Sequence, residues 1–361
     1  MAASSDSPSP MDHSACWVIE DGAFRPCPSP ASEFSSLVVL HTHSRFSTEN
    51  LASLNWVAEL PYMRPLKGLL KRSFGLGDVP EVDYRQMCYT PPYEPDDIWR
   101  MEKESAGRLG FDRVLLSLTD HDEVAGGLQL LDRLPDQHGR IGIGEELSIR
   151  FEGYLFHLGV SGLPQAGLIE AHASLQQAAR EGRLDAVFDR LHALGCLVVL
   201  NHPLLAWNGD DAEPVPVLDL LARYGWAIHA LEFNGMRSFS ENQRVIQLAG
   251  RVGKPLVGGG DSHLLRASAA LSASRASSYA DFVAEVKSGW SRPLVKREYF
   301  RSHRWKLTLR VLSFIAQYRR VASFRGEPVA ERLAGRIVLL DPIGVAARGV
   351  LALADRFGRL A

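Results

Sequence analysis

Short apolar runs recur along the chain, and polar residues follow most of them directly. The runs fit buried strands, and the segments between them have the spacing of amphipathic helices. Strands are expected at 36–41, 196–200, 228–233 and 255–258, and helices at 173–182, 185–194, 215–224 and 243–252. This alternation predicts an α/β protein with a β/α barrel, whose chemistry lies at the carboxyl ends of the strands.

The polar residues at these strand ends are of the types that bind divalent metals. In chain order they are His41 and His43 in LVVLHTHS, Asp120 and His121 in VLLSLTDHD, Glu146 in GIGEELS, His157 in YLFHLGV, His202 in LVVLNHP, and Asp261 with His263 in PLVGGGDSH. Imidazole nitrogens and carboxylate oxygens together suit Zn, Mn or Fe. Residues two apart in a strand share a face, so each H-x-H or D-x-H pair can point at one cluster. The pattern is typical of a metallohydrolase.

Each piece has an ordinary structural explanation when it is taken alone. A single H-x-H pair is commonly hydrogen-bonded at the surface or in the core, and His157 between Phe156 and Leu158 fits a buried core histidine. Asp122 fits a helix N-cap. The metal interpretation therefore depends on the whole set, whose members all fall at predicted strand ends of one chain.

The ordered motifs HTHS, TDHD, G-x-E-x-S, FHLGV, NHP and GDSH resemble those of the PHP family, the polymerase and histidinol phosphatase superfamily of metal-dependent phosphoesterases. The G-x-E-x-S motif consists of Gly144, Glu146 and Ser148, and the resemblance covers residues 36–290. It implies a distorted seven-stranded β/α barrel that holds two or three divalent metal ions.

The resemblance also implies an assignment of ligands. His41, His43, Glu146 and Asp261 would hold a first ion, Glu146 would bridge to a second ion bound by His157 and His202, and His121 with His263 would bind a third. Two positions depart from the family pattern, because Leu40 replaces an Asp that precedes H-x-H in many members and Glu49 replaces a further His found in some. Glu49 could still bind an ion, and a carboxylate there favours Mn or Fe.

Hydrolysis of a phosphate ester is the reaction expected from such a cluster. Two ions that share a carboxylate can hold a bridging hydroxide near neutral pH. Asp261 and Asp120 are the candidate proton donors. Arg237 is expected to stabilise charge on the phosphoryl oxygens, and Arg45, Arg237 and Asn234 to bind the substrate. A structural ion pair is the alternative role for Arg237.

Three classes of function fit these features. The leading one is a hydrolase acting on phosphoric ester bonds, with a small phosphomonoester or a nucleotide as its substrate. The second is an exonuclease or oligonucleotide-degrading enzyme, in which basic segments guide a nucleic acid strand. The third is a non-catalytic regulatory module that keeps the barrel. The complete first and second ligand sets favour an enzyme.

The chain is expected to divide into three parts: a flexible polar segment at 1–35, the barrel at 36–290, and a basic helical C-terminal extension at 291–361. A long insertion at about 49–112 follows the first strand of the barrel. Its position fits either a lid that selects the substrate or a structural flap.

Charge is distributed unevenly along the chain. Residues 291–361 contain fifteen Lys and Arg against five Asp and Glu, a balance of +10, so the other residues carry −12 of the net −2. Within this tail, RWKLTLRVLSFIAQYRR is amphipathic, and we expect it to pack on the barrel as a helix. Contact with nucleic acid, a membrane surface or a partner protein is the alternative.

The composition is that of a soluble protein of a reducing compartment. The apolar and charged fractions, 46% and 23%, are those of globular proteins, and the four cysteines include no C-x-x-C pair. No apolar signal segment begins the chain, and the most apolar run, at 337–354, contains Asp341, Pro342 and Arg348. Charges inside a membrane span are costly, so no transmembrane segment is expected and the location predicted is cytoplasmic.

Overall fold

The computed structural model describes residues 16–50, 87–205, 216–263, 267–301, 322–324 and 327–328. The chain forms two compact units, Met1–Ser47 with Tyr93–Leu307, and Thr48–Pro92 with Thr308–Ala361. The first fifteen residues of the predicted polar segment, the amphipathic stretch 304–320 and the apolar run 337–354 lie outside the described residues.

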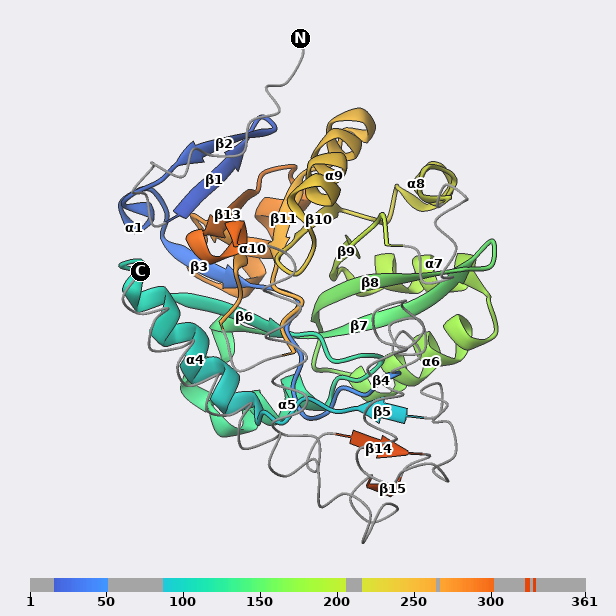
Figure 1. Cartoon of the computed structure of the whole chain (residues 1–361). Helices are drawn as coiled ribbons and strands as arrows, with labels where there is room; N and C mark the ends of the chain where they lie inside the picture. Colours follow the sequence, from blue (N-terminus) through green and yellow to red (C-terminus); the bar gives the residue numbers. More distant parts are fainter. Residues whose placement is uncertain are drawn as a thin grey trace, which may run out of the picture. The chain divides into compact units, whose positions relative to one another are not determined.

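An eleven-stranded mixed sheet forms the framework of the first unit (Figure 1). Its spatial order is β11 (Leu256–Gly259), β10 (Ala230–Asn234), β9 (Leu197–Asn201), β8 (Tyr154–Leu163), β7 (Ile141–Phe151), β6 (Val114–Leu118), β3 (Ser36–Val39), β12 (Ala270–Ser274), β13 (Arg292–Lys296), β1 (Cys16–Glu20) and β2 (Ala23–Pro26). The strands β3, β6, β7, β9, β10 and β11 all run in one direction, and β8 runs against both of its neighbours. The carboxyl ends of six strands therefore point the same way.

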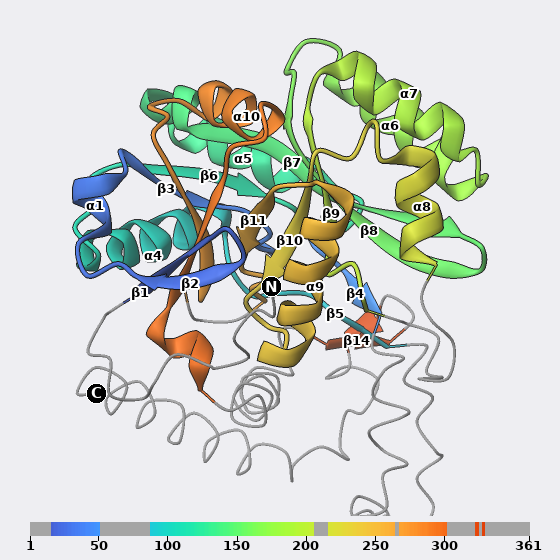
Figure 2. The same ribbon diagram turned by 90° about the horizontal axis from the view of Figure 1, so that it is seen from above.

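Helices cover the outer face of this sheet, as Figures 1 and 2 show. They are α4 (Pro95–Arg108), α5 (Ala125–Arg133), α6 (Leu168–Arg180), α7 (Leu184–Leu194), α8 (Val217–Tyr224) and α9 (Phe239–Val252). Alternate strand residues such as Leu37, Val39 and Leu116 pack with these helices in one apolar core. Both faces of a parallel sheet are buried, which explains the unbroken apolar runs in the sequence.

The opposite face of the strands packs against α10 (Tyr279–Lys287). Val38, Leu115 and Val199, which alternate with the outward residues of their strands, form a second apolar cluster with Tyr279 and Phe282 of this helix. This cluster fills the space among the amino-terminal parts of the strands. The polar residues that follow the same strands are left at the other end.

Two strands from the ends of the parallel run are joined by hydrogen bonds beyond their carboxyl termini. Gly260 donates its N–H to the carbonyl of Leu40 at 3.0 Å, and His43 donates its N–H to the carbonyl of Ser262 at 3.0 Å. The sheet order itself stays open. The predicted α/β class is therefore confirmed, while a regularly closed barrel is not formed by the described strands.

Several predicted elements agree with the structure to within a few residues. The sequence pattern predicts α6 from 173, whereas it begins at Leu168. Helix α9 also begins earlier than predicted. The sequence pattern predicts this helix from 243, whereas it begins at Phe239. Ser238 Oγ accepts the N–H of Glu241, whose carboxylate accepts the N–H of Ser238 in return. This capping box satisfies donors that a helix end otherwise leaves free, so the helix starts four residues earlier.

The boundaries of the insertion and of the tail differ from those expected. The helix α4 belongs to the first unit and packs against β6, so the part of the expected insertion assigned to the second unit is Thr48–Pro92. Likewise β13 lies in the main sheet, with Leu294 and Val295 fully buried. The expected helical extension thus begins with a strand, followed by the short helix η3 (Arg297–Phe300).

The remaining short elements are α1 (Pro30–Glu33) and η2 (Pro135–Arg140) in the first unit, and four strands in the second. In the second unit the order is β15 (Glu327–Pro328), β14 (Ala322–Phe324), β5 (Met87–Tyr89) and β4 (Glu49–Asn50), with antiparallel pairing. A strand of the C-terminal tail therefore pairs with a strand of the insertion.

The four cysteines are free thiols, and Cys196 is fully buried as predicted. Burial raises the pKa of Cys196 to about 12, so its thiol stays protonated. Across the described ranges, no helix is both long and apolar enough to cross a membrane.

Candidate metal centre

Six imidazoles and two carboxylates converge at the carboxyl ends of the parallel strands. The residues are His41 and His43 after β3, His121 after β6, Glu146 in β7, His157 in β8, His202 after β9, and Asp261 and His263 after β11. Seven of them are at most 7% exposed, and the side chain of His121 is 15% exposed. The ninth predicted ligand, Glu49, lies in β4 of the second unit, and its side chain is outside the described part of the chain.

Glu146 is at the middle of this group. Its Oε1 atom lies 3.0 Å from His41 Nε2, 3.1 Å from His202 Nε2 and 3.2 Å from His157 Nδ1. Its Oε2 atom lies 3.4 Å from His43 Nε2 and 3.3 Å from His121 Nδ1. The two oxygens of one carboxylate thus face two different sets of imidazoles, which is the arrangement of a bridging ligand.

The donor atoms form four overlapping groups, in each of which one atom per residue lies within 4.8 Å of the others. The groups are His41, His43 and Asp261; His41, Glu146 and His202; His121, Glu146 and His157; and His43, His121 and His263. Because His41, His43, His121 and Glu146 each occur in two groups, the donors suit several adjacent ions better than one.

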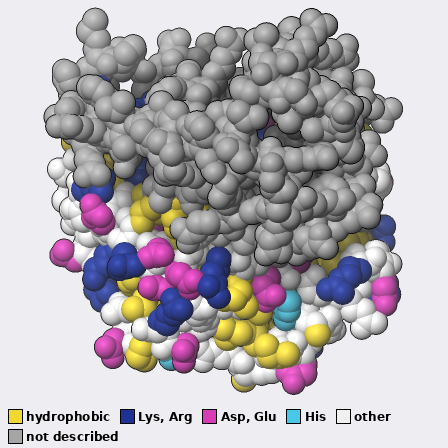
Figure 3. Space-filling view, turned by 60° about the horizontal axis from the view of Figure 1, so that its bottom comes forward, with side chains coloured by type: hydrophobic (Ala, Val, Ile, Leu, Met, Phe, Trp, Pro, Cys, Tyr) yellow, Lys and Arg dark blue, Asp and Glu magenta, His cyan; other side chains and the backbone are white. Residues whose placement is uncertain are grey.

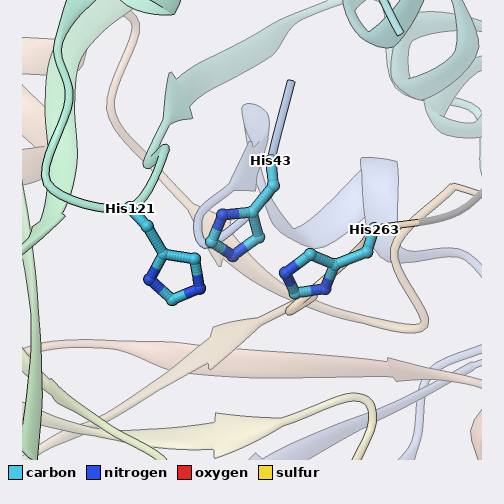
Figure 4. Close-up of side chains that lie close together, drawn as sticks. All are labelled: His43, His121 and His263. Atoms are coloured by element: carbon cyan, nitrogen blue, oxygen red, sulfur yellow. The ribbon is translucent and has the colours of Figure 1, made fainter. Parts of the chain in front are cut away.

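Three histidines from three different strands form the last of these groups (Figure 4). The ring centroids of His43 and His263 are 4.0 Å apart, and those of His43 and His121 are 4.8 Å apart. The sequence assigns His121 and His263 to a third ion, and the structure brings His43 close to both of them. This all-imidazole set is of the kind that Zn accepts.

The backbone is left-handed at three of the candidate ligands. The φ angles are +58° at His41, +28° at His202 and +46° at Asp261. Residues other than glycine rarely adopt this conformation, and each instance costs on the order of 1–3 kcal/mol. Each of these residues follows the end of a strand by one or two positions, so the left-handed turn changes the direction of its side chain. Such strain is common where the geometry of a site matters more than local stability.

The electrostatic environment differs sharply among these residues. Burial raises the pKa of Glu146, but the surrounding imidazoles, led by His41, outweigh it and hold the pKa well below its ordinary value. Burial lowers the pKa of His43, and His263 and His121 lower it further. Glu146 is therefore an anion and His43 a neutral imidazole, which are the forms that bind metal ions.

Two buried nitrogens test whether this group fits a metal. His41 Nε2 and His43 Nε2 form no hydrogen bond with any described residue, although Glu146 oxygens lie 3.0 and 3.4 Å away. A buried polar atom without a hydrogen bond costs about 1–3 kcal/mol. A divalent cation would satisfy both lone pairs and offset the charge of the carboxylates. The residues present therefore fit divalent ions such as Zn, Mn or Fe.

Asp120, predicted as a proton donor, is turned to the backbone after His43. Its Oδ1 accepts the N–H of Ser44 at 2.5 Å, and its Oδ2 accepts the Ser44 hydroxyl at 2.7 Å. Burial raises the pKa of Asp120 to about 6, against the effect of these hydrogen bonds. With both oxygens engaged, Asp120 is suited to fix the turn that carries His43.

The three predicted substrate-binding residues occupy different environments. Arg237 Nη2 lies 3.9 Å from Asp261 Oδ2, and its side chain is 21% exposed. The Arg45 side chain is half exposed, and its guanidinium pairs with Glu94 Oε1 at 2.5 Å. Asn234 is fully buried and donates its amide to Asp261 Oδ2 at 3.2 Å. Arg237 is therefore the best placed of the three to contact a bound anion.

Glu232 alternates with Asn234 in L-E-F-N, which predicts that both side chains lie on one face of a strand and line the pocket. In the structure the Oε1 atom of Glu232 is 2.5 Å from His41 Nδ1, on the side of the ring away from Glu146. The alternation of Glu232 with Asn234 in one strand predicted a shared face. It could not predict contact with a histidine from another strand.

The described surface mixes both signs of charge. On the face drawn in Figure 3, the Lys and Arg side chains lie beside Asp and Glu. Exposed ion pairs, such as Arg108 with Glu104 at 2.7 Å, also place the two signs of charge side by side. A continuous basic stripe, which a nucleic-acid groove requires, is absent from the described part of this face.

Comparisons with known proteins give distant structural similarity. No family model matches the chain, and no curated protein matches it. A protein of Bifidobacterium adolescentis named as a metal-dependent phosphoesterase shares 15% identity over 48% of this chain and 83% of its own, with a TM-score of 0.33. An amidohydrolase of Chromobacterium violaceum, solved with bound sulfate, shares 16% identity over 63% of this chain and 87% of its own, with a TM-score of 0.39.

A two-domain protein of Bacteroides vulgatus, named for a PHP-like metal-dependent phosphoesterase, is also similar. It shares 14% identity over 72% of this chain and 64% of its own, with a TM-score of 0.43. Similarity at these values says nothing of the chemistry of the site.

Proposed function

We propose that this chain is a metal-dependent phosphoesterase that hydrolyses a phosphate ester at a cluster of two or three divalent ions, Zn, Mn or Fe. The observation that carries the proposal is Glu146, whose two oxygens face separate sets of imidazoles at 3.0–3.4 Å. A bridging carboxylate between imidazole sets suits ions held side by side. Such ions, when bound, would polarise the phosphoryl group and lower the pKa of water.

The ligands divide among the ions as follows in this proposal. His41, His43 and Asp261 would hold one ion with Glu146, and His157 and His202, both beside Oε1 of the same carboxylate, would hold a second ion. His121 and His263 would hold a third ion, with His43 close to both rings. We further propose that seven strands of the main sheet correspond to the distorted barrel of the PHP type. They are β3, β6, β7, β8, β9, β10 and β11.

Arg237 would neutralise charge on the phosphoryl oxygens of the substrate. Its guanidinium lies beside Asp261 yet stays partly exposed, so it can reach a ligand that the cluster binds. Cationic donors fixed before the reaction stabilise developing charge without reorganisation.

A small phosphomonoester or a nucleotide is the proposed substrate. Among the described residues, one partly exposed guanidinium, that of Arg237, lies beside the buried cluster, and one such group suits one phosphoryl group. The mixed charge of the described part of the face in Figure 3 does not favour a long nucleic acid strand there.

The test uses the full chain, stripped with a chelator and reloaded with Zn, Mn or Fe in separate samples. The substrates are p-nitrophenyl phosphate, bis(p-nitrophenyl) phosphate and a short oligonucleotide, which distinguish monoesterase, diesterase and nuclease activity. We expect monoester hydrolysis that returns with the ion. His202→Ala should abolish it without unfolding the protein, whereas His192→Ala, a change on helix α7, should not. Undiminished turnover in the His202 variant would refute the two-ion mechanism.

A further inference from the structure

Glu232 is a buried carboxylate inside the framework of the metal centre. It lies in the middle of β10 and is 1% exposed. Ala230 precedes it on the same face of the strand, and Asn234 follows it there. A charge at such a depth is costly unless hydrogen bonds and opposite charges compensate it. The groups that form hydrogen bonds with Glu232 therefore indicate its role in the structure.

Each oxygen of Glu232 is bonded to a different candidate ligand. Oε1 accepts from His41 Nδ1 at 2.5 Å, and Oε2 accepts the backbone N–H of His202 at 2.8 Å. Oε2 also accepts the Asn234 amide at 2.9 Å. His41 and His202 both have the strained left-handed backbone. One carboxylate thus holds two strained residues that follow different strands.

The neighbouring strand β11 leaves room for this carboxylate because position 259 carries no side chain. A side-chain carbon added at Gly259 of β11 would lie 1.8 Å from Glu232 Oε1. Glycine at 259 therefore allows the backbone of β11 to pass the carboxylate closely. Position 40, where the family resemblance leads one to expect an orienting Asp, holds the buried apolar Leu40. The carboxylate on the outer nitrogen of His41 comes from β10 instead.

We propose that Glu232 is a positioning residue that fixes the ring orientation and tautomer of His41 and the backbone of His202, so that both present their donor atoms to the metal ions. The inference rests on the metal centre of the proposed function and adds to it a residue outside the ligand set. A carboxylate that accepts from Nδ1 keeps the proton on that nitrogen. His41 Nε2 then keeps its lone pair for a metal ion.

Replacement by glutamine separates this role from simple packing. Glutamine has the same shape, but it has one acceptor oxygen and one donor NH2 group. If its oxygen faces His41, its NH2 group meets the N–H of His202 and the amide of Asn234. If its NH2 group faces His41, Nδ1 must become an acceptor and the proton moves to Nε2. Either orientation damages one ligand, although the volume is unchanged.

The experiment measures metal affinity, which does not depend on catalysis. Chelator-stripped wild type and Glu232→Gln are titrated with Zn against a chromophoric chelator. We expect affinity to fall by about 10- to 100-fold, the range typical of lost partners of metal-binding histidines. Glu102→Gln is the matched control, because Glu102 is also fully buried but bonds to Ser268. Its affinity should equal that of wild type.

Nitrogen NMR of the imidazoles provides a second measurement. In wild type, His41 should carry its proton on Nδ1, with the signal assigned by its loss in His41→Gln. In Glu232→Gln, one orientation of the amide moves the His41 proton to Nε2. The other orientation leaves that proton on Nδ1 but changes the imidazole signals of His202. A variant that binds Zn as tightly as wild type, with His41 still protonated on Nδ1, would overturn the inference.

Further outcomes keep the inference and the proposed function distinguishable. If Glu232→Gln does not fold, Glu232→Asp is measured, since its shorter arm cannot span both His41 and His202. Its affinity should lie below that of wild type, and equal affinity counts against the inference. A wild type that binds Zn but hydrolyses no phosphate ester refutes the proposed function alone. A wild type that binds no divalent ion refutes both.

Discussion

The imidazole rings of His43 and His263 stack with their centroids 4.0 Å apart and their planes 12° apart. The two residues follow β3 and β11, and the backbone hydrogen bond from His43 to Ser262 holds the two segments together. Two protonated rings at this separation would repel each other, and burial together with His263 holds the pKa of His43 well below its ordinary value. His43 is therefore a neutral imidazole, the form that binds a metal ion.

Metal stoichiometry should depend on which member of the cluster is changed. His263 belongs to one group of donors, whereas Glu146 belongs to two. We expect His263→Ala to lose about one ion per chain and Glu146→Gln to lose more than one, because a bridging carboxylate serves both of its neighbours. Elemental mass spectrometry on protein purified without chelators measures this directly. Equal losses in the two variants would show that Glu146 does not bridge.

Arg237 should contribute to turnover without contributing to metal binding. Its guanidinium lies 3.9 Å from Asp261, and Arg237 is not one of the candidate metal ligands. We expect Arg237→Ala to lower kcat/KM for a phosphomonoester by about 100-fold, as for the loss of a preorganised donor to developing charge. The control is Arg223→Ala, which removes an exposed ion pair with Asp185. Loss of metal in the Arg237 variant would assign it a structural role instead.

Gly126 tests the packing that holds Asp120 in place. A side-chain carbon at 126 would lie 2.1 Å from Asp120 Oδ2 and 2.8 Å from Ser44 Oγ. We expect Gly126→Ala to lower the free energy of unfolding by about 1–3 kcal/mol, because the crowded carboxylate must move. Gly250→Ala is the matched change in α9, where nothing lies within 4 Å of the added carbon. It should stabilise the protein by about 0.5–1 kcal/mol in urea unfolding, because alanine favours a helix.

His229 should make stability depend on pH, at a site remote from the metal centre. Burial, with help from Lys287 and Lys254, lowers its pKa from 6.5 to about 4, and its Nδ1 accepts the N–H of Val198 at 3.0 Å. Between these two values the unfolded chain binds a proton that the folded chain does not. The free energy of unfolding should therefore fall as pH decreases from 6.5 to 4, relative to His229→Gln.

The measurement is urea unfolding of chelator-treated wild type and His229→Gln at several pH values. Above pH 6.5 the difference in unfolding free energy between the two should be constant, and it should shrink as the pH is lowered toward 4. A difference that stays constant through this window would mean that His229 is protonated in the folded state as easily as in the unfolded chain.

The candidate ligands could be found in the sequence because each follows an apolar run. A buried parallel strand needs a run such as LVVL, and the residue after the run must lie at the carboxyl edge of the sheet. The positions of His41, His202 and Asp261 therefore followed from local patterns. The early start of α9 was missed, although Ser238 and Glu241 carried the signal of a capping box.

Local sequence patterns could not predict which candidate ligands lie close together. His43 lies close to His121 and His263, a grouping that the spacing of the three motifs did not predict. Glu232 was recognised as a residue of the wall but not as the partner of His41, because β3 and β10 are not adjacent in the strand order. Contacts across a curved sheet depend on its curvature, which no local spacing encodes.

By itself, the sequence determined the α/β class, several of the strands and helices, and the candidate metal ligands, because hydrophobic periodicity and residue chemistry are local properties. The tertiary structure decided which candidate donors lie close together, which carboxylate bonds to His41, and which turns are strained. These depend on distances between segments far apart in the chain, and such distances are fixed only when the whole core packs.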